Sequence, residues 1–355
     1  MEFNGVRLQY EELSREIERA IADVLGAGRY ILGPAGQAFE EEFAQYCQVS
    51  FGVGVASGTD ALSIGLQAFG VRAGDEVLVP AVSAPATPMA VAAIGAIPRF
   101  VDISPNDFTM APSAALRCVT GRTRAIVPVH LYGMPARLKE LAELGLPILE
   151  DAAQAHGSDA SWGRAGSFGL AAAFSFYPTK NPGAYGDAGM LVTPDPGVAK
   201  NARLLRNYGQ RESYAAEIIG QNSRLDEIQA AILRVKLRRL DEWNSRRREI
   251  AARYRAAFSP LPLKMQTETG SSNYHLFVVT TSRRDALQDY LRERGVPSLI
   301  HYPISLHRQK AFSDFPASHC PNADALCSRV LSLPIHGLLS DVDVERVVEH
   351  VTGFF

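Results

Sequence analysis

Short apolar runs alternate with helix-like segments along the first part of this 355-residue chain. Parallel strands must be joined by long crossover connections, usually helices, so this alternation predicts βαβ units and a mostly parallel sheet between helices. The predicted strands are residues 51–56, 76–80, 98–102, 125–130 and 147–150, and the first helices are residues 10–25, 34–46 and 60–69. The fold class is therefore α/β.

A longer helical pattern begins after Asn222, where Leu225, Ile228, Ile232 and Val235 follow apolar helical spacing. We expect one long helix that contains the boundary between two domains. Residues 1–240 would form a large domain and residues 241–355 a smaller C-terminal α+β domain, on which the helix of residues 10–25 is also a candidate to pack. The elements expected in the smaller domain are a strand at 274–280, a helix at 284–294 and a closing helix from residue 341.

The formal net charge of −2 provides no basic field for nucleic acid. The basic run at residues 234–239 is followed by Asp241 and Glu242, which indicates a solvated helix face. No apolar run approaches the ~20 residues of a membrane span, and the N-terminus does not resemble a signal peptide. We therefore expect a cytoplasmic protein with no nucleic-acid or membrane partner.

The four cysteines are scattered along the chain at positions 47, 118, 320 and 327. None belongs to a Cys-x-x-Cys pair, and His319 beside Cys320 has no matching second pair. The sequence therefore predicts reduced thiols and no metal site.

Lys180 and Asp151 form the most informative pair in the chain. Lys180 closely follows an apolar run, where desolvation would lower its pKa and leave part of the amine neutral and nucleophilic. Asp151 closely follows the apolar run of residues 146–149. This is the position expected of a carboxylate that keeps a pyridine nitrogen protonated. The two residue types at two strand ends point to pyridoxal 5′-phosphate.

A possible anion site lies at Ser57, Gly58 and Thr59, between a predicted strand and a predicted helix. The first N–H groups of a helix lack partners and favour negative charge, although a simple helix cap has the same sequence. The glycines at 52, 54 and 58 are spaced one residue too far apart for a dinucleotide fingerprint. A nicotinamide-binding domain is therefore the weaker interpretation.

These motifs, taken in order, resemble the DegT/DnrJ/EryC1/StrS family of sugar aminotransferases, which have the aspartate aminotransferase fold type I. The resemblance covers nearly the whole chain. It rests on residues 30–34, 57–62, 150–157, 174–181, 206–210, 222–227 and 301–303, together with His307. It implies a seven-stranded, mostly parallel sheet in a large pyridoxal-phosphate-binding domain.

The resemblance also implies a role for each matched residue. Lys180 would be the lysine that binds the cofactor as an imine, Asp151 the partner of the pyridine nitrogen and Gln154 the neighbour of the phenolic oxygen. The implied phosphate contacts are Ser57, Gly58, Thr59, Ser175 and, from the other subunit of a homodimer with shared active sites, Asn222. Residues 82–87 lack the aromatic residue that stacks on the cofactor in many members, so the stacking partner is left open.

Lysine at position 180 implies an aminotransferase, because family members that dehydrate keto sugars carry histidine there. L-Glutamate is the implied amino donor. Residues 177–181 and 183–187 resemble the group that aminates dTDP-3-keto-6-deoxyhexoses, for antibiotic or surface-glycan biosynthesis. The candidate substrate contacts are Tyr177, Tyr185, Arg206, Arg224, His301, Tyr302 and His307.

Several alternatives stay open at this point. Within the family, the substrate is alternatively a 4-keto sugar or a UDP-linked 3-keto sugar. Outside it, a nucleotide-sugar oxidoreductase would require a nicotinamide cofactor, and a regulator that binds pyridoxal phosphate without catalysis would keep Lys180 but not turn over an amino donor.

Overall fold

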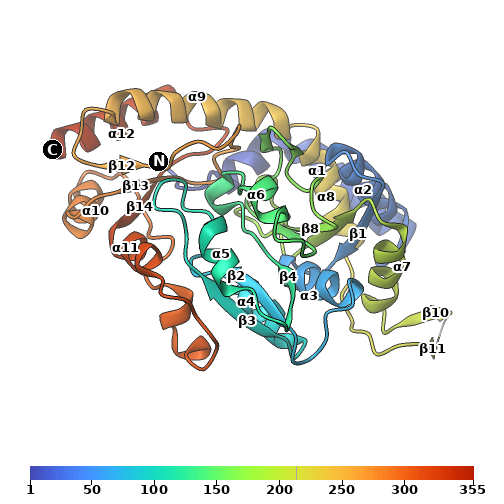
Figure 1. The fold of residues 1–355 in the computed structure, drawn as a ribbon. Coiled ribbons are helices and arrows are strands. Elements are labelled where there is room, and N and C mark those ends of the chain that lie inside the picture. The colour runs from blue at the N-terminus through green and yellow to red at the C-terminus, as the bar shows by residue number, and fades with distance from the viewer. Residues whose placement is uncertain (213) are drawn as a thin grey trace.

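The central element of the computed structural model is a twisted sheet of seven strands (Figure 1). The model describes residues 1–212 and 214–355. Strands in the order β3-β2-β4 continue through parallel bridges from Ile126 to Ile148 and from Val129 to Asp151 into the order β5-β8-β9-β1. These strands are β1 (Phe51–Val55), β2 (Glu76–Pro80), β3 (Ile97–Val101), β4 (Thr123–Ile126), β5 (Leu149–Asp151), β8 (Ala171–Ser175) and β9 (Gly189–Thr193).

Only β9 runs antiparallel to its neighbours in this sheet of the described chain. The other strands are parallel and heavily buried, and their Val, Ile, Leu, Phe and Ala side chains fill the main core. This confirms the mostly parallel sheet and the fold class expected from the sequence.

Helices cover both faces of the sheet, as crossover connections require. Helix α3 packs on β8 and β9, whereas α2 packs on β1 and α8, and α1 packs on α8. The helices of this part are α1 (Val6–Ala27), α2 (Pro34–Tyr46), α3 (Gly58–Ala68), α4 (Ala86–Ala93), α5 (Pro112–Cys118), α6 (Leu138–Ala142), α7 (Pro196–Leu205) and α8 (Glu227–Leu237), with the 3₁₀ turn η1 (Leu131–Gly133).

The long helix expected after Asn222 is two helices. Helix α8 begins only at Glu227, and α9 (Leu240–Phe258) follows a break at Arg238 and Arg239. The apolar spacing continues through the break because both helices bury one face, so periodicity alone did not reveal it.

A second core lies under α9, which runs along one side of the molecule toward the C-terminus (Figure 1). An antiparallel sheet with the order β12-β13-β14 packs there with α10 and α12. The elements that follow α9 are β12 (Lys264–Met265), β13 (Phe277–Thr280), α10 (Arg284–Glu293), η2 (Leu306–Arg308), η3 (Lys310–Phe312), α11 (Pro321–Arg329), β14 (Val330–Leu333) and α12 (Asp341–Phe354). Of these, η2, η3 and α11 bury their apolar side chains in the main core. Helix α1 itself contacts α8, while Phe3 before it contacts His301 of this second part.

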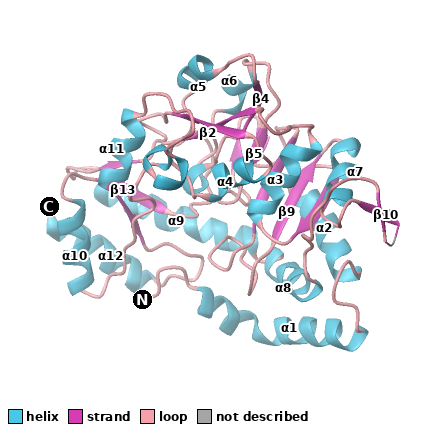
Figure 2. Ribbon diagram, turned by 90° about the horizontal axis from the view of Figure 1, so that it is seen from below, coloured by secondary structure: helices cyan, strands magenta, loops and turns pink. Residues whose placement is uncertain are grey.

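Two small two-stranded sheets complete the described elements. Strands β6 (Asp159–Ala160) and β7 (Gly163–Arg164) pair near the large core, and β10 (Gln210–Glu212) and β11 (Ala215–Ala216) form an arm that projects from the body (Figure 2).

The fold positions a site because parallel strands end at one edge of the sheet. Asp151 ends β5, Ser175 ends β8, and Ser57 follows β1 at the start of α3. Ligands bind at this edge in open α/β sheets, because loops and helix N-termini converge there.

Candidate active site

Eight of the residues selected from the sequence line one cavity of about 280 Å³ at the carboxyl edge of the sheet. They are Ser57, Gly58, Thr59, Asp151, Gln154, Ser175, Tyr177 and Lys180. The other residues that line the cavity are Leu62, Ser83, Ala84, Ala86, Val129, Ala153 and Asp187. The carboxylate, the amine and the hydroxyl groups therefore come from separate strands but reach a common space.

Asp151 is held in position by donors on both carboxylate oxygens. Thr87 Oγ1 donates to Oδ2 at 2.7 Å, and the backbone N–H of Ala153 donates to Oδ1 at 3.2 Å. Ser83 Oγ lies 2.8 Å from Thr87 Oγ1 and extends the chain of hydroxyl groups. Burial raises the pKa of Asp151, while the hydrogen bonds from Thr87 and Ala153 and the charge on Lys180 oppose that rise.

Sequence reasoning missed Ser83 and Thr87. Both lie just beyond β2, in the segment of residues 82–87, which contains no aromatic residue. Their signal is the position itself, since small polar residues that follow a parallel strand lie at the edge where ligands bind.

Lys180 sits in a tight turn after β8, where its backbone N–H donates to the carbonyl of Tyr177 at 2.8 Å. Burial lowers the pKa of Lys180 to about 8, and the negative charge of Asp151 partly opposes this change. A larger fraction of the amine is therefore neutral near pH 8 than for an exposed lysine. The group is suited to attack a carbonyl and to accept and return a proton.

The start of α3 provides hydroxyl and amide donors across from Lys180. Ser57 Oγ accepts from the N–H of Asp60 at 3.1 Å, and Ser175 Oγ accepts from the N–H of Tyr177 at 3.3 Å, so both hydroxyl protons stay available to a ligand. A Cβ at Gly58 would lie 2.6 Å from Ser175 Cβ, which explains glycine where α3 approaches β8. The arrangement suits an anion with several oxygens.

Gln154 links the cavity to the second part of the chain. Its Oε1 accepts from the N–H of Tyr132 at 2.6 Å, and its Nε2 donates to Tyr302 Oη at 3.2 Å. Burial raises the pKa of Tyr302 to about 12, so the phenol is neutral. In the segment of residues 82–87, where many family members have an aromatic residue, Ala84 lines the cavity, and Val129 contributes another apolar surface.

Asn222 and Arg224 line a neighbouring cavity of about 470 Å³, and Asp187 lines both cavities. Arg224 Nη1 donates to Asn207 Oδ1 at 2.9 Å and its guanidinium lies 5.3 Å from the ring centroid of Tyr208. Within one chain, these two residues and Lys180 line different spaces.

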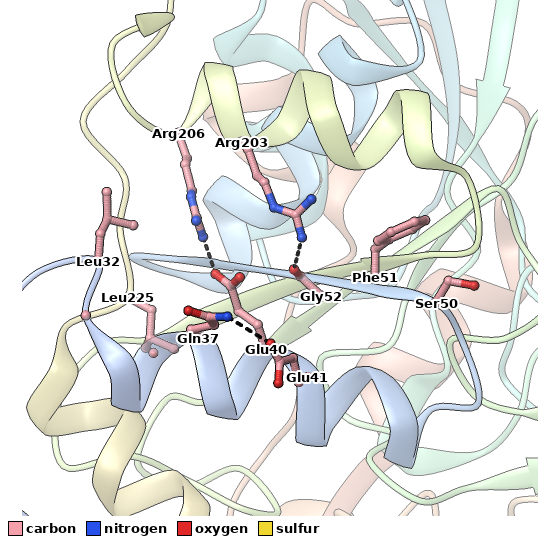
Figure 3. A pocket seen from close by; sticks show the side chains of 12 residues that line it. Leu32, Gln37, Glu40, Glu41, Ser50, Phe51, Gly52, Arg203, Arg206 and Leu225 are labelled. Carbon is pink, nitrogen blue, oxygen red and sulfur yellow. Dashed lines mark hydrogen bonds and ion pairs between the residues drawn. The ribbon is translucent and has the colours of Figure 1, made fainter. Parts of the chain in front are cut away.

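Arg206 does not line the cavity that contains Lys180 and Asp151. It pairs with Glu40 and donates to the carbonyl of Gly54 at 2.8 Å, in a separate cavity of about 510 Å³ between α2 and α7 (Figure 3). With 8% of its surface exposed, Arg206 joins α7 to β1 and α2. Arg206 therefore has a structural role within the chain, as the ion-pair partner of Glu40.

Three further substrate candidates, Tyr185, His301 and His307, do not line the cavity either. The ring of Tyr185 lies under Lys236, with its centroid 3.9 Å from Lys236 Nζ. His301 Nδ1 lies 2.9 Å from Ser332 Oγ, and His307 Nε2 lies 3.5 Å from Asp324. Burial lowers the pKa of His301 to about 4 and lowers that of His307, so both rings are neutral near pH 7.

The described part of the chain also lacks two kinds of feature. No group of three or more His, Cys, Asp or Glu side chains there has the arrangement of a metal site. None of its helices combines the length and apolar character needed to cross a membrane.

The model of the DegT/DnrJ/EryC1/StrS aminotransferase family matches residues 11–352. The chain belongs to this family. It is 45% identical to a dTDP-3-amino-3,4,6-trideoxy-α-D-glucose transaminase of Streptomyces venezuelae, over 98% of this chain and 94% of the relative. It is 40% identical to a UDP-N-acetyl-3-dehydro-α-D-glucosamine 3-aminotransferase of Acidithiobacillus ferrooxidans, over 96% of this chain and 94% of that protein.

Among solved structures, S. venezuelae DesV in complex with a ketimine intermediate superimposes with a TM-score of 0.97 at 45% identity. The match covers 99% of this chain and 98% of that one. Family membership makes this protein a pyridoxal-phosphate-dependent aminotransferase. The residues present fit that cofactor, because one cavity combines a desolvated amine, a hydrogen-bonded carboxylate and the hydroxyl-rich start of a helix.

Proposed function

We propose that this aminotransferase transfers the amino group of L-glutamate to C3 of a dTDP-linked 3-keto-6-deoxyhexose. The observation that carries the proposal is the cavity that unites Lys180, Asp151 and the start of α3 in a chain 45% identical to a dTDP-3-amino-sugar transaminase. The sequence around Lys180 supports amination at C3, since residues 177–181 and 183–187 resemble that group of the family.

The chain's own residues would divide the work as follows. Asp151, aligned by Thr87, would face the pyridine nitrogen and keep it protonated, and Ser57, Thr59 and Ser175 would hold the phosphate. When bound, the cofactor supplies an electron sink for the carbon that loses its proton. In the half-reaction with glutamate, Lys180 would accept the proton that leaves the α-carbon of the amino donor. In the half-reaction with the keto sugar it would donate a proton to C3, as its lowered pKa of about 8 permits.

We also propose that two copies of the chain complete each site. Asn222 is exposed and lines the neighbouring cavity, which shares Asp187 with the catalytic one. It also matches a residue that contacts the partner's phosphate in the family. The adjacent arm exposes Tyr214 and Ile219, each 97% accessible, and Ile218 beside them is exposed to 43%. Exposed apolar side chains that gather in one patch are typical of an interaction surface. A second copy of the chain is the proposed cover.

The test is an incubation of the purified protein and pyridoxal phosphate with L-glutamate and a panel of keto sugars. The panel contains dTDP-3-keto-, dTDP-4-keto- and UDP-3-keto-hexoses, and NMR locates the new amine. We expect glutamate-dependent amination at C3 of the dTDP substrate. Nitrogen on C4, or turnover only of the UDP-linked sugar, would overturn the substrate assignment, and turnover with other amino donors but not glutamate would overturn the donor.

A further inference from the structure

A second lysine is buried close to the catalytic cavity without lining it. Lys236, on α8, has 0% of its surface exposed. Its Nζ donates to the carbonyl of Gly183 at 2.7 Å and lies 3.9 Å from the ring centroid of Tyr185. Burial lowers the pKa of Lys236 to about 7. Burying an amine costs free energy, and both groups that compensate it belong to the loop that follows Lys180.

The same loop is attached to the helix pair at two more points. Gln229, seven residues before Lys236 and hence on the same face of α8, accepts from the N–H of Tyr185 at 2.9 Å. On α9, the buried Asn244 accepts from Asn181 Nδ2 at 3.4 Å. Loop residues 181, 183 and 185 therefore each contact α8 or α9. Lys236 makes the contact with residue 183 and also contacts the ring of residue 185.

Movement at Gly183 would reach Lys180 through close backbone packing. A Cβ on Gly183 would lie 2.2 Å from the carbonyl oxygen of Pro178, so the two backbone segments already touch. The N–H of Ala184 donates to the carbonyl of Phe176 at 2.7 Å, which closes a loop with Lys180 in its middle. Residues 176–184 are therefore packed as one unit, and Lys236 contacts this unit through the carbonyl of Gly183.

We propose that Lys236 is a positioning residue that fixes the loop of residues 181–185 and thereby sets where the amine of Lys180 stands in the catalytic cavity. The inference rests on the proposed role of Lys180. Lys236 does not touch the cavity itself, so its effect passes through Gly183 and Tyr185. A displacement of an ångström at a reacting group is enough to cost about a hundredfold in rate, so such a support is significant.

The test compares Lys236→Met, which removes the ammonium but keeps an unbranched side chain, with Lys200→Met at an exposed position. In the cofactor-free protein, amide hydrogen exchange of residues 181–187 is measured. In the loaded protein, the pH midpoint of the absorbance band of the Lys180 linkage is measured. For Lys236→Met we expect exchange about tenfold faster and a midpoint shifted by about half a pH unit or more. For Lys200→Met both should equal those of the unmodified chain.

An unchanged exchange rate of residues 181–187 and an unchanged pH midpoint in a folded Lys236→Met protein would overturn the proposal. Lys236 would then contribute only packing to the interior. If Lys236→Met does not fold, Gln229→Leu weakens the same loop at its other α8 contact and is judged by the same two readings. Borohydride reduction and peptide mapping of the unmodified chain separate the two claims. Linkage at Lys180 with both readings unchanged would overturn only the role of Lys236, whereas linkage elsewhere would overturn the role of Lys180 on which it rests.

Discussion

Desolvation acts on the two central residues in opposite directions. It raises the pKa of Asp151 and lowers that of Lys180, so each is driven toward its neutral form, while each charge stabilises the other. Thr87 and Ala153 add hydrogen bonds that favour the carboxylate. The cavity therefore holds a carboxylate able to interact with a cationic ring and an amine that deprotonates easily.

The reactivity of Lys180 should follow its lowered pKa. Below pH 8 the amine is increasingly protonated, so the reactive fraction should fall about tenfold per pH unit, and above pH 8 it should level off. Competitive acetylation of the cofactor-free protein with trace acetic anhydride, quantified by peptide mass, measures this, with exposed Lys200 as the internal reference. A midpoint near 10 would contradict the desolvation argument.

Asp151→Asn should leave pyridoxal phosphate bound but slow the half-reaction with glutamate, because an amide does not stabilise a protonated pyridine. We expect a loss of about a hundredfold or more in the single-turnover rate constant, with little change in cofactor affinity. Stopped-flow absorbance gives both quantities. Asp159→Asn, in β6 outside the catalytic cavity, is the control, and an unchanged rate for Asp151→Asn would remove this residue from the site.

At the scale of elements, β1, β2 and β5 were predictable because their apolar runs are short and are followed by polar residues. Strands β8 and β9 were not among the predicted strands. The segment after Asn222 was harder, since the break at Arg238 and Arg239 preserves the apolar spacing. Arg206 looked like a ligand contact because a single sequence does not reveal that Glu40, 166 residues away, neutralises it. Long-range pairs of this kind determine which matched residues reach a cavity.

Glu227 provides another long-range contact that sequence reasoning did not find. Its buried carboxylate accepts from the backbone N–H groups of Gly33, Ala35 and Gly36 at 2.8, 2.7 and 2.8 Å, and so caps α2 from α8. Glu227→Ala leaves these donors unpaired and should lower the free energy of unfolding by about 2–4 kcal/mol. Urea denaturation measures the change, with the exposed Glu349→Ala as control. A loss no larger than the control's would contradict the capping role.

At the scale of the whole molecule, the motifs of the sequence were enough to predict the large sheet, the family and the cofactor. They were less informative about Asn222, Arg224 and the arm of β10 and β11, which lie at the surface of a single chain. The contacts of Arg224 with Asn207 and Tyr208 within one chain do not reveal a role toward another molecule, so that role has to be tested in the assembly.

Hybrid dimers test the shared site. Lys180→Ala and Asn222→Ala chains should each be nearly inactive alone, but unfolding and refolding them together should restore about a quarter of the wild-type activity. Random pairing makes about half of the dimers hybrids, each with one intact site. Mixing without refolding is the control. Failure to complement, or full activity of a monomer at concentrations where sedimentation shows no dimer, would contradict a shared site.

The most direct test of the central claim locates the cofactor linkage. Two lysines have lowered pKa values, about 8 for the half-buried Lys180 and about 7 for the buried Lys236, so acidity alone does not identify the reactive one. Only Lys180 lines the cavity with Asp151. After loading with pyridoxal phosphate, borohydride reduction and trypsin digestion, the added mass should appear on the peptide of residues 165–200, uncleaved at Lys180. Added mass on the peptide of residues 235–238, which contains Lys236, would contradict the account.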